Sequence, residues 1–175
     1  MDIGTAFGTL GARREMMVGF LAEPALLMVI FVASLLSATT ALPLIAERLV
    51  VQPLALYPSL AFTAVAFTMV LLAENARVPV DNPATHLELT MIHEAMLLEY
   101  SARHLALMEW AAALKLFNYA CIGFALFVPW GTSIGETGIG ALALSIPALL
   151  AKLAVAGLWL ALLETVSAKL RVFRA

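Results

Sequence analysis

Four ionisable side chains interrupt otherwise apolar stretches of this 175-residue sequence, and their types suit proton transfer. Two are carboxylates, Glu23 and Glu109, and two are lysines, Lys115 and Lys152. A charge at the centre of a membrane helix costs about 2.5–3.5 kcal/mol on insertion scales, so such residues usually face a protein interior or a hydrated cavity. We therefore predict that these four residues belong to a proton or ion path. Structural lysine–carboxylate pairs that fasten helices together are the alternative.

Other kinds of reactive site have weaker support in the sequence. His86 and His93 lie seven residues apart with Glu94 beside the second, but a zinc site needs three or four convergent ligands, and no HExxH or CxxC motif occurs. The single cysteine, Cys121, lies in an apolar run without a neighbouring base. No Gly-x-Ser-x-Gly turn and no phosphate-binding glycine loop is found. We predict no catalytic residue, metal centre or cofactor in this chain.

The composition is typical of a membrane protein. Hydrophobic residues make up 63% of the chain and charged residues 13%, with a mean hydropathy of +0.98, whereas soluble domains are about 45–50% apolar and about 25% charged. The net charge of −2 and the lack of a basic cluster exclude nucleic-acid binding. The first 17 residues lack the basic lead and cleavage site of a signal peptide, so the first apolar run is expected to be a permanent span.

Four apolar stretches reach the roughly 20 residues that cross a hydrocarbon core about 30 Å thick. They cover about residues 16–42, 54–73, 102–128 and 138–165, and segments with proline, glycine or serine join them. The sequence therefore predicts an all-α integral membrane protein. We expect a single membrane domain over residues 1–175, a bundle of four transmembrane helices, with the lipid bilayer as its surroundings.

The cations predict an orientation in the membrane. Seven of the ten Lys and Arg residues lie in the three segments on one side of the predicted spans, while Arg48 is the only cation in the segments on the other side. Cytoplasmic loops carry such an excess of positive charge. Both termini and residues 74–101 are thus expected on the cytoplasmic side of a prokaryotic cell membrane.

Residues 74–101, between the second and third predicted spans, are unusually polar. Pro79 and Pro83 disfavour helix at the residues before them. Thr85 and Glu88 then have the spacing of a capping box, which predicts a short amphipathic helix over about residues 86–100. Two opposed polar stripes on this helix suit a position between the bundle and a partner protein.

This polar segment resembles the signature of the complex I subunit-1 family, the H-type membrane subunit of proton-pumping NADH:quinone oxidoreductase. That family reads Ala-Glu-x-Asn-Arg-x-Pro-Phe-Asp-x-Pro-Glu-x-Glu-x-Glu-Leu and, later, Glu-Tyr-Ser. Glu23, Glu109 and Lys152 also fit ionisable positions of the family's fourth, sixth and seventh spans. The chain would then correspond only to the fourth through seventh spans of the family, as a fragment or as the product of a split or truncated gene. Matching residues in the signature are Ala73, Glu74, Arg77, Pro79, Asp81, Pro83, Glu88, Leu89, Glu99, Tyr100 and Ser101.

Departures from this signature indicate one branch of the family. Val80 replaces the family's Phe, and Ala84 and His86 stand where two of its acids would be. In these respects residues 80–101 are more similar to membrane subunits of [NiFe] hydrogenases, of the hydrogenase-4 component C or formate hydrogenlyase type. The resemblance therefore favours this branch over the quinone-site subunit of NADH:quinone oxidoreductase. The quinone-site subunit remains an alternative, and its ligand would be a quinone.

The resemblance implies a membrane-anchor subunit of an oxidoreductase complex, without a catalytic centre of its own, that takes part in proton or ion translocation. Its partners would be iron–sulfur and large hydrogenase-type subunits on the cytoplasmic side, which would carry iron–sulfur clusters and a [NiFe] centre, and antiporter-like membrane subunits. A freestanding ion transporter or antiporter, and a purely structural anchor, remain alternatives. The residues implied in docking are Glu74, Arg77, Pro79, Asp81, Glu88, Glu99 and Tyr100.

Overall fold

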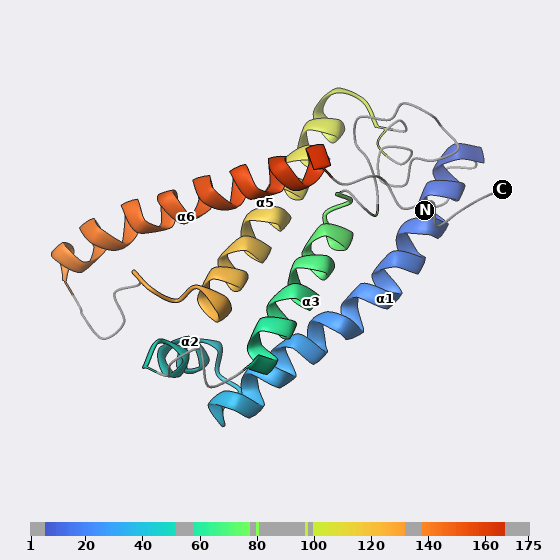
Figure 1. The fold of residues 1–175 in the computed structure, drawn as a ribbon. Coiled ribbons are helices and arrows are strands. Elements are labelled where there is room, and N and C mark those ends of the chain that lie inside the picture. The colour runs from blue at the N-terminus through green and yellow to red at the C-terminus, as the bar shows by residue number, and fades with distance from the viewer. Residues whose placement is uncertain are drawn as a thin grey trace.

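The chain folds as a set of long helices in the computed structural model, which describes residues 6–51, 58–77, 100–131 and 138–166, together with residues 80 and 97. No strand occurs in these described segments (Figure 1). The predicted all-α membrane fold is confirmed. The helices are α1 (Ala6–Ser37), α2 (Leu42–Val51), α3 (Pro58–Glu74), α5 (Ala102–Phe127) and α6 (Ile139–Val166).

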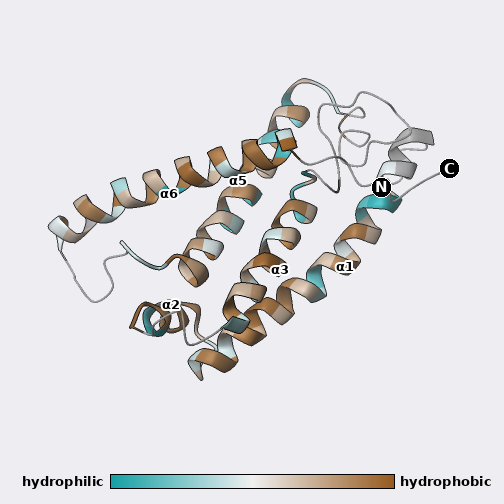
Figure 2. Ribbon diagram, in the orientation of Figure 1, coloured by the Kyte–Doolittle hydropathy of each residue, from teal (hydrophilic) through white to brown (hydrophobic). Residues whose placement is uncertain are grey.

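Three stretches are long and apolar enough to cross a membrane: Gly11–Ser37, Ala102–Phe127 and Ile139–Val166. Figure 2 shows the hydrophobic residues that dominate these helices. Helix α3 has only 17 residues, about 26 Å at about 1.5 Å per residue. It is therefore slightly shorter than a hydrocarbon core of about 30 Å.

The first predicted span and the segment after it differ from the structure in their bounds. Helix α1 ends at Ser37 rather than near residue 42, because Ala38 adopts a left-handed backbone with φ of 50° and the amide of Thr39 turns back to the carbonyl of Ser34. Residues 42–51, expected as a joint, form α2. Pro43 lies in the first turn, where its missing N–H is not needed, and residues that favour helix follow. The amphipathic helix expected over residues 86–100 lies outside the described residues, apart from residues 97 and 100.

The two ends of the bundle differ in packing. We call the end where α3 finishes and α5 begins the loop end, and the opposite end the far end. At the far end α1, α2, α3 and α5 share an apolar core whose members are each at most 3% exposed. Helix α2 lies next to α1 and α5 there (Figure 1). Helix α1 packs mainly against α3. The far-end core consists of Ala33, Ile45, Leu49, Leu60 and Leu126.

Cations cap two helices. The Arg48 guanidinium of α2 donates a hydrogen bond to the carbonyl of Ser37, the last residue of α1. Lys152 Nζ donates to the carbonyl of Val128, directly after α5, at 2.7 Å. The carbonyls at a helix C-terminus carry a partial negative charge that a cation stabilises. These two cations therefore hold the ends of α1 and α5 in place.

Helices α3 and α5 approach each other closely at an aromatic cluster. The Phe67 ring lies with its centroid 6.4 Å from that of Tyr119 and 5.5 Å from that of Phe127. Gly123 faces the same ring, and a Cβ added there would lie 2.8 Å from Phe67 Cε1. A side chain at position 123 would therefore fit at this level only if the Phe67 ring moved.

We expect Gly123→Ala to lower the stability of the protein by about 1–3 kcal/mol, the usual cost of overpacking a core. Thermal unfolding in detergent would measure the change. Gly157→Ala is the matched control, because a Cβ there meets no atom within 4 Å and reports helix propensity alone. Phe67→Leu should restore much of the stability of Gly123→Ala. An unchanged midpoint for Gly123→Ala would contradict the observed packing.

Candidate functional site

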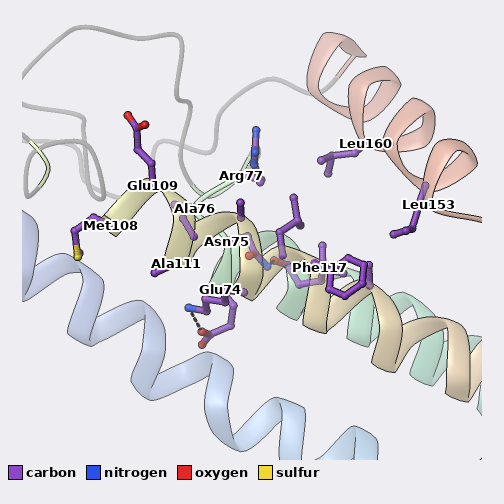
Figure 3. A pocket seen from close by; sticks show the side chains of 18 of the residues that line it. Glu74, Asn75, Ala76, Arg77, Met108, Glu109, Ala111, Phe117, Leu153 and Leu160 are labelled. Atoms are coloured by element: carbon purple, nitrogen blue, oxygen red, sulfur yellow. Dashed lines mark hydrogen bonds and ion pairs between the residues drawn. The ribbon is translucent and has the colours of Figure 1, made fainter. Parts of the chain in front are cut away.

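The site begins with an ion pair where α3 ends. Glu74 is the last residue of α3, and its Oε2 lies 2.7 Å from Nζ of Lys115 on α5 (Figure 3). The Glu74 side chain is only 11% exposed. Its other oxygen, Oε1, is buried and has no hydrogen-bond partner among the described residues. An unpaired buried acceptor costs about 1–3 kcal/mol, so a water molecule or another hydrogen-bond donor would be stabilised at this atom.

A tight turn follows Glu74 and directs the chain toward α6. Ala76 adopts a left-handed backbone with φ of 49°. The amide of Arg77 bonds to the carbonyl of Leu72 at 2.9 Å, which satisfies an otherwise free carbonyl at the helix end. Arg77 then pairs with Glu164 of α6, with 3.1 Å between Arg77 Nη1 and Glu164 Oε1. Glu74 and Arg77, at the end of α3, are thus attached by ion pairs to α5 and α6 respectively.

A cavity of about 510 Å³ lies on the α1 side of this ion pair. Glu15 and Glu23, two turns apart on α1, line it together with Glu74 and Lys115. Three carboxylates and one amine therefore border one space. Glu23 is exposed and lies at its rim. Such a set can hold a proton at several alternative positions.

A larger cavity of about 850 Å³ lies between α5, α6 and the end of α3. Its polar lining is concentrated near the loop end and includes Asn75, Arg77 and Glu109, whereas the remainder is mostly apolar. Glu74 and Lys115 line this cavity as well as the smaller one. The ion pair therefore lies between two cavities and borders both.

The lengths of the helices account for this arrangement. Lys115 lies 13 residues after Ala102, about 20 Å along α5 at about 1.5 Å per residue. Because its partner Glu74 is the final residue of α3, α5 extends beyond α3 by several turns toward the loop end. Without α3 beside it, this part of α5 leaves room for the larger cavity.

The structure brings some of the predicted site residues together and separates others. Glu23 and Lys115 share the smaller cavity, and Glu109 lines the larger one. Lys152 lines neither cavity and instead caps α5. Of the residues predicted for docking, Glu74 and Arg77 form ion pairs within the chain and Tyr100 is 37% exposed. The predicted docking residues Pro79, Asp81, Glu88 and Glu99 lie outside the described residues.

Two residues of this site, Glu15 and Glu164, were not predicted from the sequence. Glu15 lines both cavities, and its spacing of eight from Glu23 already places both on one helix face. Glu164, which was not singled out from the sequence, pairs with Arg77. No local pattern links Arg77 with Glu164, because they are 87 positions apart in the sequence. Within the described part of the chain, no group of three or more His, Cys, Asp and Glu residues is arranged to hold a metal ion.

Comparison with known proteins agrees with the resemblance seen in the sequence. The model of the family described as NADH dehydrogenase matches residues 1–175. Formate hydrogenlyase subunit 4 of Escherichia coli strain K12 is 31% identical over 172 residues, which are 98% of this chain and 55% of that protein. Hydrogenase-4 component C of the same strain is 30% identical over 131 residues, which are 75% of this chain and 40% of that protein. The chain spans about half the length of these curated relatives.

A double-mutant cycle would measure the energy of the central ion pair. We expect Glu74→Gln and Lys115→Met each to lower stability by roughly 1–3 kcal/mol, less than the 3–5 kcal/mol of a fully buried pair, because Lys115 is 41% exposed. The double variant should lose clearly less than the sum of the two, since it leaves no unpaired charge. Unfolding in detergent gives all three values. Strict additivity would show that the two charges do not interact.

Proposed function

Because the chain belongs to the NADH dehydrogenase family, that of complex I subunit 1, we propose that it is a membrane-anchor subunit of a complex I-related oxidoreductase. The names of its relatives favour a complex of the [NiFe]-hydrogenase or formate hydrogenlyase type. In this role the chain has no catalytic centre and binds the soluble electron-transfer arm. Iron–sulfur clusters and the [NiFe] centre belong to partner subunits, and antiporter-like subunits adjoin the chain in the membrane.

The proposed docking surface is the segment of residues 74–101, at the loop end and on the cytoplasmic side with both termini. Support comes from the attachment of its first residues. Glu74 and Arg77 are fixed to α5 and α6 by ion pairs, so the start of the segment has a defined position before a partner binds. Such preorganisation reduces the entropy lost on association. Asp81, Glu88 and Glu99 would then meet charged groups of the arm.

The same ion pairs connect docking with ion translocation in this proposal. The observation that carries it is that Glu74, at the root of the docking segment, also borders both cavities with Lys115. A change of charge in the arm would alter the balance between the paired and the protonated form of Glu74. In this proposal protons pass between the pair and Glu15, Glu23 and Glu109, which line the same two cavities. Lys152 is less suited to the path, because its amine caps α5.

We expect Glu74→Gln and Glu23→Gln to reduce proton translocation in inverted membrane vesicles that contain the whole complex. Electron transfer to an artificial acceptor by the soluble arm should change little. Glu47→Gln is the matched control, because Glu47 lies on α2 at the far end and lines neither cavity. Normal proton translocation in both site variants would reject these carboxylates as members of the path.

We expect the tagged chain, extracted from its native membrane in mild detergent, to bring iron–sulfur proteins with it. Asp81→Lys should lower their recovery severalfold by reversing a charge of the docking segment, whereas Glu47→Lys should not. Immunoblots of the soluble subunits measure the recovery. A chain that purifies alone and fully active as an ion carrier would instead support the freestanding transporter.

A further inference from the structure

Arg77 is held in place through both its backbone and its side chain. Its amide donates a hydrogen bond to the carbonyl of Leu72 at 2.9 Å, in the turn that follows α3. Its guanidinium donates from Nη1 to Oε1 of Glu164 on α6 at 3.1 Å. A free arginine side chain has many rotamers and loses entropy when a partner fixes it. Because these two contacts already restrict Arg77, a group that binds it does so with a smaller loss of entropy.

The contact with Glu164 leaves most of the guanidinium available. An arginine has five N–H donors in a planar fork, and within the described residues no second hydrogen bond of the Arg77 guanidinium is found. The Arg77 side chain is 33% exposed. In Figure 3 it points away from Glu74, and thus away from the central ion pair. Arg77 can therefore donate two parallel hydrogen bonds to one further carboxylate, the group whose geometry matches the fork.

The charges of the docking segment set Arg77 apart. It is the only Lys or Arg within residues 74–101, which contain five acidic residues. An acidic surface attracts basic groups of a partner, and like charges that meet in a wrong register repel each other. A single cation in such a surface favours a carboxylate opposite it and disfavours any register that places a basic group there. The acidic residues are Glu74, Asp81, Glu88, Glu94 and Glu99.

Glu164 has the properties of a support for Arg77 rather than of a competitor for it. Its side chain is 28% exposed, and ion pairs that water can reach contribute little energy. The contact also involves a single nitrogen of Arg77. A bidentate carboxylate would therefore not have to displace Glu164. The main effect of Glu164 is geometric, because it holds the guanidinium in one orientation.

We propose that Arg77 binds an aspartate or glutamate side chain of the soluble arm, and that Glu164 is the positioning residue for this contact. The inference rests on the proposed function, because it assigns one contact within the proposed docking surface. The carboxylate of the arm accepts hydrogen bonds from Nε and Nη2 of Arg77, while Glu164 keeps its contact with Nη1. As the single basic contact of an acidic segment, Arg77 sets the register in which the arm docks.

Recovery of the soluble arm with the tagged chain, extracted from native membranes in mild detergent, tests the role of Glu164. Glu164→Ala should lower the recovery by about fivefold, because Arg77 then has to be ordered on binding. Glu164→Gln should retain it, because the amide oxygen still accepts the hydrogen bond from Nη1. Any other pattern overturns the positioning role. Equal losses would mean that the negative charge itself is needed, and gains in both variants would mean that Glu164 competes with the arm.

The same measurement tests Arg77 against a second cation at the loop end. Arg77→Ala should lower the recovery by about tenfold or more, the usual effect of losing hydrogen bonds to a charged group. Arg103→Ala, which removes an exposed cation at the start of α5, should lower it much less. Equal losses would reveal a general attraction by positive charge and overturn the specific contact. Normal recovery from Arg77→Ala overturns this inference alone, whereas a native chain that brings no arm with it overturns the proposed function as well.

A zero-length cross-link identifies the carboxylate of the partner. In the whole complex, Arg77→Lys provides an amine that a water-soluble carbodiimide joins to a neighbouring carboxylate. Glu164→Gln is combined with it, so that the carboxylate within the chain cannot react. The proposal predicts a cross-linked peptide between position 77 and an aspartate or glutamate of a soluble-arm subunit, detected by mass spectrometry. The absence of this peptide from complexes that retain the arm overturns the proposal.

Discussion

The ion pair between Glu74 and Lys115 is the constraint on which the rest of the site depends. A lysine within a membrane helix needs an anionic partner or water, and the final residue of α3 supplies the partner at 2.7 Å. The pair fixes the level at which α3 ends beside α5. It therefore determines where the polar segment leaves the bundle and why cavities remain on either side. In our proposal the same two residues form a structural lysine–carboxylate pair and also belong to the ion path.

The closed far end complements this open site. Its apolar core and the two cation caps immobilise the ends of α1 and α5. Arg48 and Lys152 both donate hydrogen bonds to carbonyls at helix ends. Titratable side chains that border cavities are found toward the loop end, next to the segment that we propose for docking. This contrast supports our proposal, in which docking of the soluble arm alters the protonation of groups at the loop end.

Periodicity and hydropathy predicted the long helices well, because lipid exposure imposes a simple apolar pattern. The ends of α5 and α6 differ from the predicted bounds by only one residue. The helix of residues 42–51 was missed because the segment contains proline and charges, although Pro43 occupies a position where proline favours helix. Among the site residues, Glu23, Lys115 and Glu109 were recognised as charges in apolar runs. The pairing of Arg77 with Glu164 and the capping role of Lys152 depend on distances between helices, which no local pattern contains. The family match agrees with the resemblance found in the polar segment.

Redox-difference infrared spectroscopy of the assembled complex tests the coupling most directly. Reduction of the soluble arm should change the protonation of Glu74, and a protonated carboxyl group has a distinct C=O stretching band. The account predicts a carboxyl band in the reduced-minus-oxidised spectrum that disappears in Glu74→Gln and persists in Glu47→Gln. A spectrum that is identical in the native protein and in Glu74→Gln would contradict it.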